Sequence, residues 1–374
     1  MKKLFSAVIA LFICVCIVPV SAEEISISAS AAAVINGDNG EVIYLKNADE
    51  RLPMASTTKI MTALLLCEHG DFNREITVTK EMLAVEGSSM GLLPGDTVTL
   101  HDLLYGMMLA SGNDAANVTA FVIGGSVRGF VDMMNEKAQA IGLQNTHFAT
   151  PSGLDADDHY TTALELANLA RYAMQNEDFA AAASSESSVL NYGNPPYRRT
   201  LTNHNRLLKY FNGAVGVKTG FTKKSGRCLV SAAKRDGKYV IAVTLHDPND
   251  WSDHEQMLEY GFSAIQQIQC SPEKAEYIIP VIGGSKDSLT VKTEPYTVNS
   301  VKTAEVTCKT QLPKFLYAPI KKGEIIGTIN YFSDGEEIAV GELIAEENIG
   351  KAPTGQNYID RWLKNAADII GNFY

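Results

Sequence analysis

The spacing of apolar residues divides the chain into a long region of helices and strands and a shorter region of strands. Residues 32–35 and 41–44 flank the run Asn-Gly-Asp-Asn-Gly, which predicts a β-hairpin over residues 31–47. Residues 56–68 place Ile60, Met61, Leu64 and Leu65 at helical spacing and predict a helix with one buried face. The same spacing predicts helices at 103–109, 115–123, 131–141 and 163–174.

Strand patterns return in the last third of this mixed region. Residues 214–217 form an apolar run that leads into Lys218, and residues 228–233 and 239–245 flank a turn at 235–238. Ser252 and Glu255 have the spacing of a capping box, which predicts the start of a helix that extends to about residue 268.

A separate all-β domain is predicted after Pro272. Residues 277–281, 288–291, 303–309, 324–331 and 337–344 form short strand patterns separated by Gly, Pro and Asp turns. A linker with Pro353 and Gly355 follows, and a terminal helix begins at about residue 358.

The terminal helix has one apolar face but is too short and too charged to span a bilayer. This amphipathic pattern predicts attachment to a membrane surface, and docking on the β-domain is the alternative. The apolar face holds Ile359, Trp362, Leu363, Ala366, Ile370 and Phe373.

The N-terminus has the pattern of a secretory signal peptide. Lys2 and Lys3 precede an apolar segment at 4–18, and Val20-Ser21-Ala22 is a small-residue cleavage site, so residues 1–22 are predicted to be removed. A retained membrane anchor and a lipoprotein modified at Cys14 or Cys16 are the alternatives.

Composition excludes several classes of protein. The formal net charge of −11 argues against nucleic-acid binding. The cysteines beyond residue 22 are too widely spaced for a disulfide framework, and Cys67 and Cys228 lie in apolar runs that predict buried thiols. The seven histidines show no paired spacing, so we predict no metal and no cofactor, and a metal-dependent peptidase is disfavoured.

Three polar motifs carry the candidate chemistry. They are Ser56-Thr57-Thr58-Lys59, Ser111-Gly112-Asn113 and Lys218-Thr219-Gly220. Ser56 and Lys59 are three residues apart at a predicted helix start, so their side chains share one face beside the positive end of the helix dipole. A serine with a neighbouring amine can attack a carbonyl if burial and a second cation lower the pKa of that amine. Taken singly, the motifs also fit a helix cap, a turn and a strand end.

The order of the motifs is typical of penicillin-binding proteins and class A β-lactamases. Residues 53–62, 108–116 and 216–222 resemble the low-molecular-mass penicillin-binding proteins that are serine-type D-alanyl-D-alanine carboxypeptidases, and the likeness covers about residues 32–262. It implies an α+β fold, with a penicillin-binding/β-lactamase-like catalytic domain of antiparallel sheet and helical subdomain, followed by a small all-β domain. The implied division is signal peptide 1–22, catalytic domain 23–272, β-rich domain 273–350, and linker with membrane-anchor helix 351–374.

The resemblance also implies catalytic roles. Ser56 is the acylated nucleophile, Lys59 is its general base, and Ser111 passes a proton to the leaving D-alanine. The assignment of the base is disputed in this superfamily. The role of His204, which precedes the third motif, stays open.

The remaining motif residues are implied to bind the substrate. Asn113 binds its amide, Lys218 and Thr219 bind the terminal carboxylate, and Gly220 lets the substrate chain approach the strand. Phe221 and the nucleophile donate backbone N–H groups to the oxyanion, each worth roughly 3 kcal/mol.

The function implied is removal of the terminal D-Ala from peptidoglycan stem pentapeptides outside the cytoplasm, with β-lactam antibiotics as covalent inhibitors. A β-lactamase is the nearest alternative, because Glu165 and Asn168 superficially resemble its water-binding pair, but the apolar spacing of 161–171 predicts that Glu165 is an exposed helix residue. A non-catalytic sensor is disfavoured because all three motifs are intact.

Overall fold

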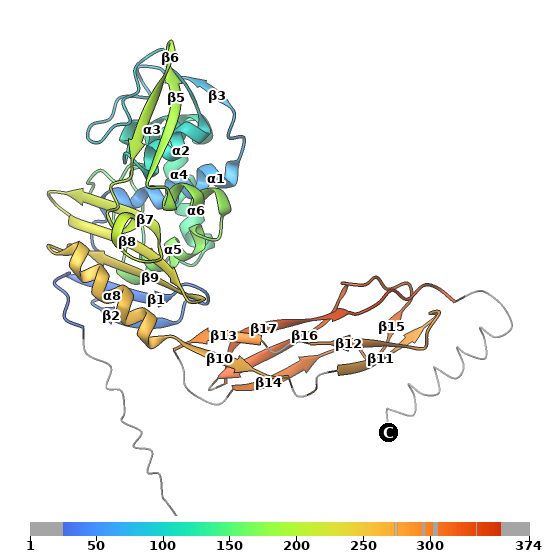
Figure 1. Ribbon diagram of the computed structural model, residues 1–374. Helices are drawn as coiled ribbons and strands as arrows, with labels where there is room; N and C mark the ends of the chain where they lie inside the picture. The colour runs from blue at the N-terminus through green and yellow to red at the C-terminus, as the bar shows by residue number, and fades with distance from the viewer. Residues whose placement is uncertain are drawn as a thin grey trace, which may run out of the picture.

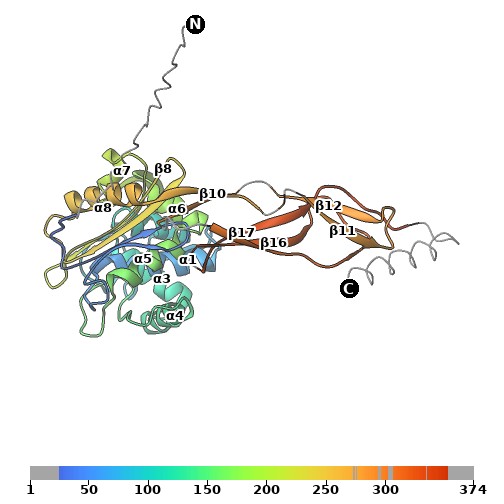
Figure 2. The ribbon, with the colours of Figure 1, turned by 90° about the horizontal axis from the view of Figure 1, so that it is seen from below.

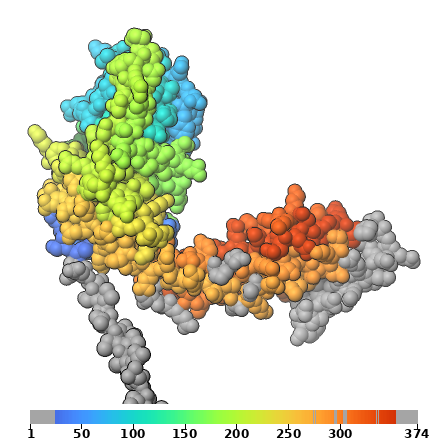
Figure 3. Space-filling model, viewed as in Figure 1, coloured from blue at the N-terminus to red at the C-terminus, as the bar shows by residue number. Residues whose placement is uncertain are grey.

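The structure is a computed structural model that describes residues 25–352 except 273, 275, 294–295, 302–305 and 334. Figure 1 shows an upright lobe of helices and strands and a long, narrow lobe of strands that extends from its base. The space-filling view shows the two lobes joined only at that base (Figure 3). The α+β fold with a following β-domain is therefore confirmed, while the predicted signal peptide and terminal helix lie outside the described residues.

A five-stranded antiparallel sheet forms the centre of the upright lobe, in the order β2-β1-β9-β8-β7. The predicted hairpin is confirmed as its first two strands. It pairs with β9 near the other end of the lobe's sequence, and β7 forms the opposite edge of the sheet. The strands are β1 (Ala31–Asn36), β2 (Val42–Lys46), β7 (Ala214–Thr222), β8 (Gly226–Arg235) and β9 (Lys238–Leu245).

Both faces of this sheet are buried, which explains why β1 is apolar from Ala31 to Ile35 rather than alternating. Ala31, Ala33 and Ile35 belong to the core under the helical subdomain, while Ala32 and Val34 belong to the core under α8 (Asp250–Ala264). Figure 2 shows α8 on one side of the sheet and α5 (Ala163–Ala173) on the other.

The helical subdomain confirms the predicted helices within a few residues. The first of them begins as the 3₁₀ turn η1 (Ala55–Thr58) and becomes α-helical only at Lys59. That helix is α1 (Lys59–His69). The other helices are α2 (Leu100–Met108), α3 (Asn113–Gly124), α4 (Val127–Ala140) and α6 (Glu177–Ser184), and the short α7 (Leu207–Tyr210) leads into β7.

A four-stranded sheet beside these helices was not predicted from the sequence. It has the order β3-β4-β5-β6, and a pair between Thr97 and Gly193 joins its halves. Two of its strands have only three residues, too few for an alternating pattern to be read. The strands are β3 (Glu75–Thr77), β4 (Thr97–Thr99), β5 (Ser187–Gly193) and β6 (Pro196–Thr202).

The predicted bounds of α8 are wrong at both ends. The cap residue is Asn249 rather than Ser252, and it makes no side-chain cap hydrogen bond. Asp250 and Asp253 in the first turn instead complement the positive end of the helix dipole. The helix ends at Ala264, and the chain continues as the strand β10 (Gln266–Cys270), which pairs with β13 (Tyr296–Ser300).

The long lobe confirms the prediction of an all-β domain. Its six-stranded sheet has the order β14-β16-β17-β12-β11-β15, and β10 and β13 form a two-stranded sheet beside it. Its separate apolar core includes Ile279, Val281, Leu289 and Tyr331. The strands are β11 (Glu276–Ile282), β12 (Ser288–Lys292), β14 (Val306–Gln311), β15 (Leu316–Tyr317), β16 (Ile325–Ser333) and β17 (Glu336–Ala345).

Polar contacts join the two lobes. The Asn299 side-chain amide donates to the Asp38 carboxylate at 2.8 Å and to the Gly237 carbonyl at 2.7 Å, and its backbone carbonyl accepts from Asn36 at 2.8 Å. These groups lie at the hairpin turns of the central sheet, so the junction is at the end of the sheet strands.

Cys67 and Cys228 are both buried, as predicted. Burial raises the pKa of the Cys67 thiol to about 12 and that of the Cys228 thiol to about 11, so both are inert thiols at neutral pH. Within the described part of the chain, no helix has the length and apolar character needed to cross a bilayer.

Candidate active site

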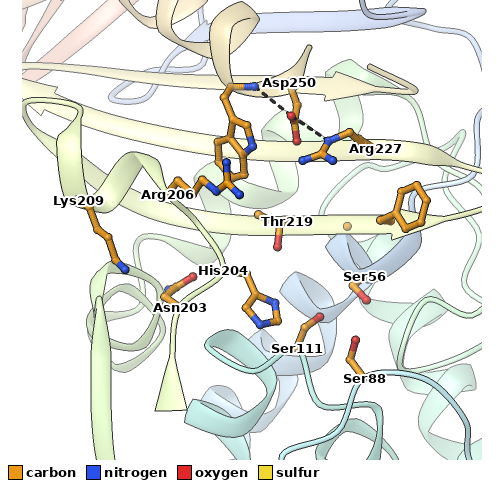
Figure 4. Close-up of a pocket in the computed structure, with 13 residues that line it drawn as sticks. Ser56, Ser88, Ser111, Asn203, His204, Arg206, Lys209, Thr219, Arg227 and Asp250 are labelled. Carbon is orange, nitrogen blue, oxygen red and sulfur yellow. Dashed lines mark hydrogen bonds and ion pairs between the residues drawn. The ribbon is translucent and has the colours of Figure 1, made fainter. Parts of the chain in front are cut away.

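The three sequence motifs meet at a cavity of about 590 Å³ along the edge strand β7 (Figure 4). The cavity lies between β7 and the helical subdomain, so residues far apart in the sequence share one wall. Its lining residues are Ser56, Ser88, Ser111, Asn203, His204, Arg206, Lys209, Thr219, Gly220, Phe221, Arg227, Asp250 and Trp251.

Ser56 lies in the 3₁₀ turn η1, directly after a residue with an unusual backbone conformation. Ala55 has a φ of 47°, in the left-handed region that a residue with a Cβ rarely adopts. The Thr58 hydroxyl donates to the Ala55 carbonyl at 2.7 Å, and the Thr57 hydroxyl donates to the Met54 carbonyl at 2.6 Å. These bonds hold the turn that presents the Ser56 hydroxyl to the cavity.

Lys59 is fully buried and makes three polar contacts through its amine. Its Nζ lies 3.0 Å from Ser56 Oγ, 2.7 Å from Asn113 Oδ1 and 2.6 Å from the Ser152 carbonyl oxygen. A neutral amine has two hydrogens and one lone pair. Because the amide and carbonyl oxygens can only accept, they take both hydrogens, and the lone pair then faces the Ser56 hydroxyl.

The pKa of Lys59 is well below its ordinary value, because burial penalises the charged form and the charge of Lys218 adds to that penalty. The Asp114 carboxylate opposes both effects. Lys218 is also buried, and burial lowers its pKa to about 7. The site therefore favours a neutral Lys59, the form that accepts a proton from serine.

Ser111 and Lys218 form a second serine–lysine pair across the cavity. The Lys218 amine donates to Ser111 Oγ at 3.1 Å and to the Thr219 carbonyl at 2.9 Å. Ser111 lies in the loop between α2 and α3 with a φ of 56°, again in the left-handed region. Since Lys218 is only 1% exposed, the alternative of a strand-end lysine that reaches solvent is wrong.

The Asn113 side chain is bonded to protein groups on both sides. Its carbonyl oxygen accepts from Lys59, and its amide nitrogen donates to the Glu86 carbonyl at 2.6 Å. The next residue, Asp114, accepts backbone N–H bonds from Met90 at 3.0 Å and Leu92 at 3.1 Å. The start of α3 thus orients the Lys59 amine and fixes the loop that carries Ser88.

Gly220 lies against the backbone of Ser56. A Cβ at this position would lie 3.0 Å from both the Ser56 nitrogen and the Met54 oxygen, closer than side chains normally pack. The glycine therefore lets β7 approach the turn that carries Ser56, in addition to any approach of a substrate chain. The next residue, Phe221, also lines the cavity, and its side chain is 66% exposed.

A buried histidine that the sequence did not indicate supports the same turn. His159 Nδ1 accepts from the Ala149 N–H at 2.9 Å, so Nε2 carries the proton and donates to the Thr58 hydroxyl at 2.7 Å. That hydroxyl in turn donates to the Ala55 carbonyl. Burial lowers the pKa of His159 to about 4, which keeps it in this neutral form. A chain of hydrogen bonds thus runs from the 149–159 segment to the residue before Ser56.

Cations line the far part of the cavity, and sequence reasoning missed them. Arg227 Nε donates to the Asp250 carboxylate at 3.0 Å, and the Arg206 guanidinium lies 5.7 Å from the Trp251 ring centre. One indication of Arg227 was present in the sequence: it is a basic residue directly before the apolar strand at 228–233, and the turn between this strand and the Lys-Thr-Gly motif is short. His204 also lines the cavity, and burial together with the charge of Lys218 lowers its pKa.

The expected exposure of Glu165 is wrong, although this residue is not among those that line the cavity. Its half-buried carboxylate accepts from the backbone N–H groups of Gln144 and Asn145 and from the Thr146 hydroxyl, at 2.9, 2.8 and 2.6 Å. Glu165 therefore fixes a loop that follows α4.

Comparisons with known proteins match both lobes. A family model described as D-alanyl-D-alanine carboxypeptidase matches residues 18–249, and one described as the C-terminal domain of penicillin-binding protein 5 matches residues 272–351. The chain is 33% identical to D-alanyl-D-alanine carboxypeptidase DacF of Bacillus subtilis, over 88% of each chain. It is 31% identical to DacC of Escherichia coli, over 87% of this chain and 86% of the relative.

Solved structures give the same result. The chain matches the D-alanyl-D-alanine carboxypeptidase DacD from Francisella tularensis with a TM-score of 0.65 and 28% identity, over 88% of this chain and 96% of that one. It matches penicillin binding protein 5 from Haemophilus influenzae with a TM-score of 0.65 and 27% identity, over 88% and 99%. The resemblance noted in the motifs is confirmed, and the chain belongs to the D-alanyl-D-alanine carboxypeptidase family of low-molecular-mass penicillin-binding proteins.

Proposed function

We propose that this protein is a serine-type D-alanyl-D-alanine carboxypeptidase that removes the terminal D-Ala from peptidoglycan stem pentapeptides. One observation carries the proposal: the Lys59 amine lies 3.0 Å from Ser56 Oγ while its other two partners are oxygens that only accept. This arrangement leaves a lone pair for the serine proton and so activates Ser56 as a nucleophile.

In the acylation step, Ser56 Oγ attacks the carbonyl carbon of the penultimate D-Ala, and its proton passes to Lys59. The negative charge that develops on the carbonyl oxygen is stabilised by the backbone N–H groups of Ser56 and Phe221. The close approach of Gly220 to the Ser56 nitrogen supports this role, because it brings the two donating segments together.

The leaving group then needs a proton and a site for its carboxylate. Ser111 gives its proton to the departing amine and receives the proton that Lys59 took from Ser56, so that Lys59 is neutral again, while Lys218, 3.1 Å from Ser111 Oγ, orients that hydroxyl. The Thr219 hydroxyl binds the terminal carboxylate within the positive field of Lys218 and Arg227. Asn113 holds the Lys59 amine through its carbonyl oxygen, and its amide nitrogen, which already donates one hydrogen to the Glu86 carbonyl, is proposed to donate the other to the substrate amide.

Water completes the reaction by attacking the ester, with Lys59 again accepting a proton. A β-lactam enters the same sequence because its ring amide imitates the D-Ala-D-Ala bond, and β-lactam inhibition is characteristic of this family. Its amine stays tethered to the acyl group after the ring opens, so it continues to block the path of water.

The test is to measure D-alanine release from a stem pentapeptide alongside the turnover of penicillin. We expect release of D-alanine, together with a stable penicilloyl adduct in intact-mass spectra that Ser56→Ala abolishes. An adduct that persists in Ser56→Ala would refute Ser56 as the nucleophile. Fast penicillin turnover without D-alanine release would indicate a β-lactamase instead.

We propose the domain division made from the sequence: a signal peptide at 1–22, the catalytic domain at 23–272, the β-rich domain at 273–350, and a linker with an anchor helix at 351–374. Enzymes of this family act on the cell wall outside the cytoplasm, and we propose that this protein does the same at the outer face of the cytoplasmic membrane. The apolar face of the terminal helix, which includes Trp362 and Phe373, supports surface attachment.

Liposome co-sedimentation tests the attachment. The protein from residue 23 onward should sediment with vesicles, resist high salt and be released by detergent, because two basic residues matched by acids give little electrostatic attraction. The same protein without residues 355–374 should stay in the supernatant. Equal soluble fractions for the two proteins would refute the anchor.

A further inference from the structure

Two carboxylates at the start of α8 hold the first described segment of the chain. The Ser28 hydroxyl lies 2.8 Å from Asp253 Oδ2 and 2.8 Å from Asp247 Oδ1. The Ser28 N–H also donates to Asp253 Oδ2. Asp253 belongs to the first turn of α8, and Asp247 lies just after β9. Three segments that are distant in the sequence therefore meet at one serine side chain.

These contacts need one proton more than a serine and two ionised carboxylates supply. A serine hydroxyl has a single hydrogen, so it can donate to only one of the two carboxylate oxygens. The other contact, also at 2.8 Å, is a hydrogen bond only if that carboxyl group is protonated and donates to Ser28 Oγ. Without that proton, two negative charges would face each other across one hydroxyl. The geometry therefore calls for one neutral carboxyl group in the pair.

Asp247 is the better holder of this proton. It is only 1% exposed, and its Oδ2 makes no hydrogen bond within the part of the chain that the structure describes. Asp253 instead accepts two hydrogen bonds from Ser28 and lies in the first turn of α8, where the helix dipole favours a negative charge. Burial raises the pKa of Asp247 and the charge of Asp253 adds to this effect, while the hydrogen bonds from Ser28 and Asn249 oppose it.

No cation neutralises the two carboxylates. Among the described residues, no ion pair includes Asp247 or Asp253. The other charged and titratable groups on the elements packed around them have partners of their own. These are Asp250 with Arg227, Arg206 with the Trp251 ring, Lys46 with the Ile27 carbonyl, His246 with the Ser225 carbonyl, and His254 with the Ser231 and Thr244 hydroxyls. The proton is therefore what allows the two carboxylates to share Ser28.

The segment around Ser28 contributes apolar side chains to the core under α8. Ile27 and Ala29 flank Ser28 and are buried there, whereas Ser28 itself is exposed, so protons from solution can reach it. The next residue, Ser30, is bonded to the sheet, because its N–H donates to the His246 carbonyl at 3.1 Å. If the contacts of Ser28 were lost, residues 25–29 could therefore leave the core while β1 stayed in place.

We propose that Asp247, Ser28 and Asp253 form a proton-dependent clasp, which holds residues 25–29 against α8 in mild acid and releases them as the pH rises. The folded protein keeps a proton on Asp247 that the unfolded chain loses above its ordinary pKa of about 3.9. The stabilisation is fully present below about pH 4 and is lost as the pH rises through the raised pKa of the folded state. An enzyme outside the cytoplasm meets the pH of its surroundings, so the clasp would make this packing respond to that pH.

Hydrogen–deuterium exchange of peptides that cover residues 25–30 provides the test, on the protein from residue 23 onward. Exchange is measured between pH 5 and pH 9 and corrected for the intrinsic pH dependence of amide exchange. We expect protection to fall as the pH rises, by up to about tenfold per pH unit once Asp247 ionises, the slope of one proton. Asp247→Asn and Asp253→Asn each leave a single carboxylate, so protection in either variant should no longer depend on pH.

Asp132→Asn is the matched control. Asp132 is an exposed carboxylate on α4 that pairs with Arg128, so this variant should keep the pH dependence of the unsubstituted protein. Protection that is constant with pH in the unsubstituted protein would overturn the clasp. Two other results would do the same: a pH dependence that survives in both clasp variants, which places the titrating group elsewhere, and a loss of protection at every pH in both, which makes the two carboxylates packing groups. D-alanine release is measured separately, so these results leave the proposed function untouched.

Discussion

Two clusters of buried polar side chains lie on opposite faces of the central sheet. On the helical side, Lys59 and Lys218 contact Ser56 and Ser111. On the other side, under α8, His254 is fully buried between the hydroxyls of Ser231 and Thr244, at 2.5 and 3.0 Å.

Burial lowers a pKa in both clusters, to about 7 for Lys218 and to about 3 for His254. The difference is that the helical-side cluster opens onto a cavity through its two serines, whereas neither His254 nor its two partners lines that cavity. A shifted pKa therefore reports burial, and only its combination with an accessible nucleophile indicates catalysis.

Removal of Lys59 should have the largest effect. We expect Lys59→Ala to slow acylation by penicillin about a thousandfold, because the serine loses its proton acceptor. Lys59→Arg should be equally slow, since guanidinium has no lone pair to offer. Stopped-flow acylation rates and intact mass provide the measurement. His254→Gln is the matched change in the other cluster, and a comparable loss there would erase the distinction between the two clusters.

A methyl group at Gly220 should have the next largest effect. Gly220→Ala places a Cβ about as close as 3.0 Å to the Ser56 nitrogen and should force β7 away from the nucleophile. We expect kcat to fall about 100-fold, the cost of one misplaced oxyanion donor. Gly237→Ala, at a turn on the other end of the sheet, is the control. A normal kcat in Gly220→Ala would mean that β7 can move away from the turn that carries Ser56 without any loss of activity.

The two buried histidines differ in what they support: His159 bonds the turn that carries Ser56, whereas His254 lies between two hydroxyls under α8. We expect His159→Leu to lower the acylation rate about tenfold or more through displacement of the Ser56 turn, and His159→Gln to restore much of it, since an amide can both accept and donate. His254→Leu should lower the melting temperature and leave acylation almost unchanged. If both leucine variants have a lower melting temperature and an unchanged acylation rate, then His159 contributes only to packing.

The smallest effect concerns stability and pH. The folded pKa of Lys218, about 7, lies below the unfolded value of about 10.4, so between these pH values the unfolded chain binds the extra proton. Stability due to Lys218 therefore rises with pH across this window, and below pH 7 the full penalty of a buried charge applies. We expect Lys218→Met to melt several degrees higher than the unsubstituted protein at pH 7, and this advantage to shrink toward pH 10. An advantage that does not change with pH would contradict the lowered pKa.

The sequence predicted those parts of the site that depend on local spacing. Ser56 and Lys59 share one turn, so their contact could be expected before any fold was known. Lys218 could be paired with Ser111 only through the order of the motifs. Arg206, Arg227 and His159 could not be predicted, because β-strand pairing and irregular loops bring them to the site from segments without a repeating pattern.

In the fold, too, features that depend on local spacing were predicted and features that depend on long-range pairing were not. Helices with a long apolar face and the strands around Lys218 were predicted well, whereas the β3–β6 sheet was missed because its pairing joins residues nearly a hundred positions apart, Thr97 and Gly193. The predicted cap at Ser252 was wrong because the helix already begins at Asp250, where the acids of its first turn, Asp250 and Asp253, stabilise the helix start.

The packing around Ala55 also limits how this enzyme can change under antibiotic selection. A Cβ on Gly153 would lie 2.0 Å from the Ala55 oxygen, and one on Gly220 would lie 3.0 Å from the Ser56 nitrogen, so neither segment has room for a larger residue. In the proposed mechanism, substrate and drug react with the same hydroxyl, that of Ser56, between these two tightly packed segments. We therefore expect escape variants to accumulate on the exposed rim near Arg206 and Lys209, where a mutation can alter the drug contact and still leave a viable cell wall.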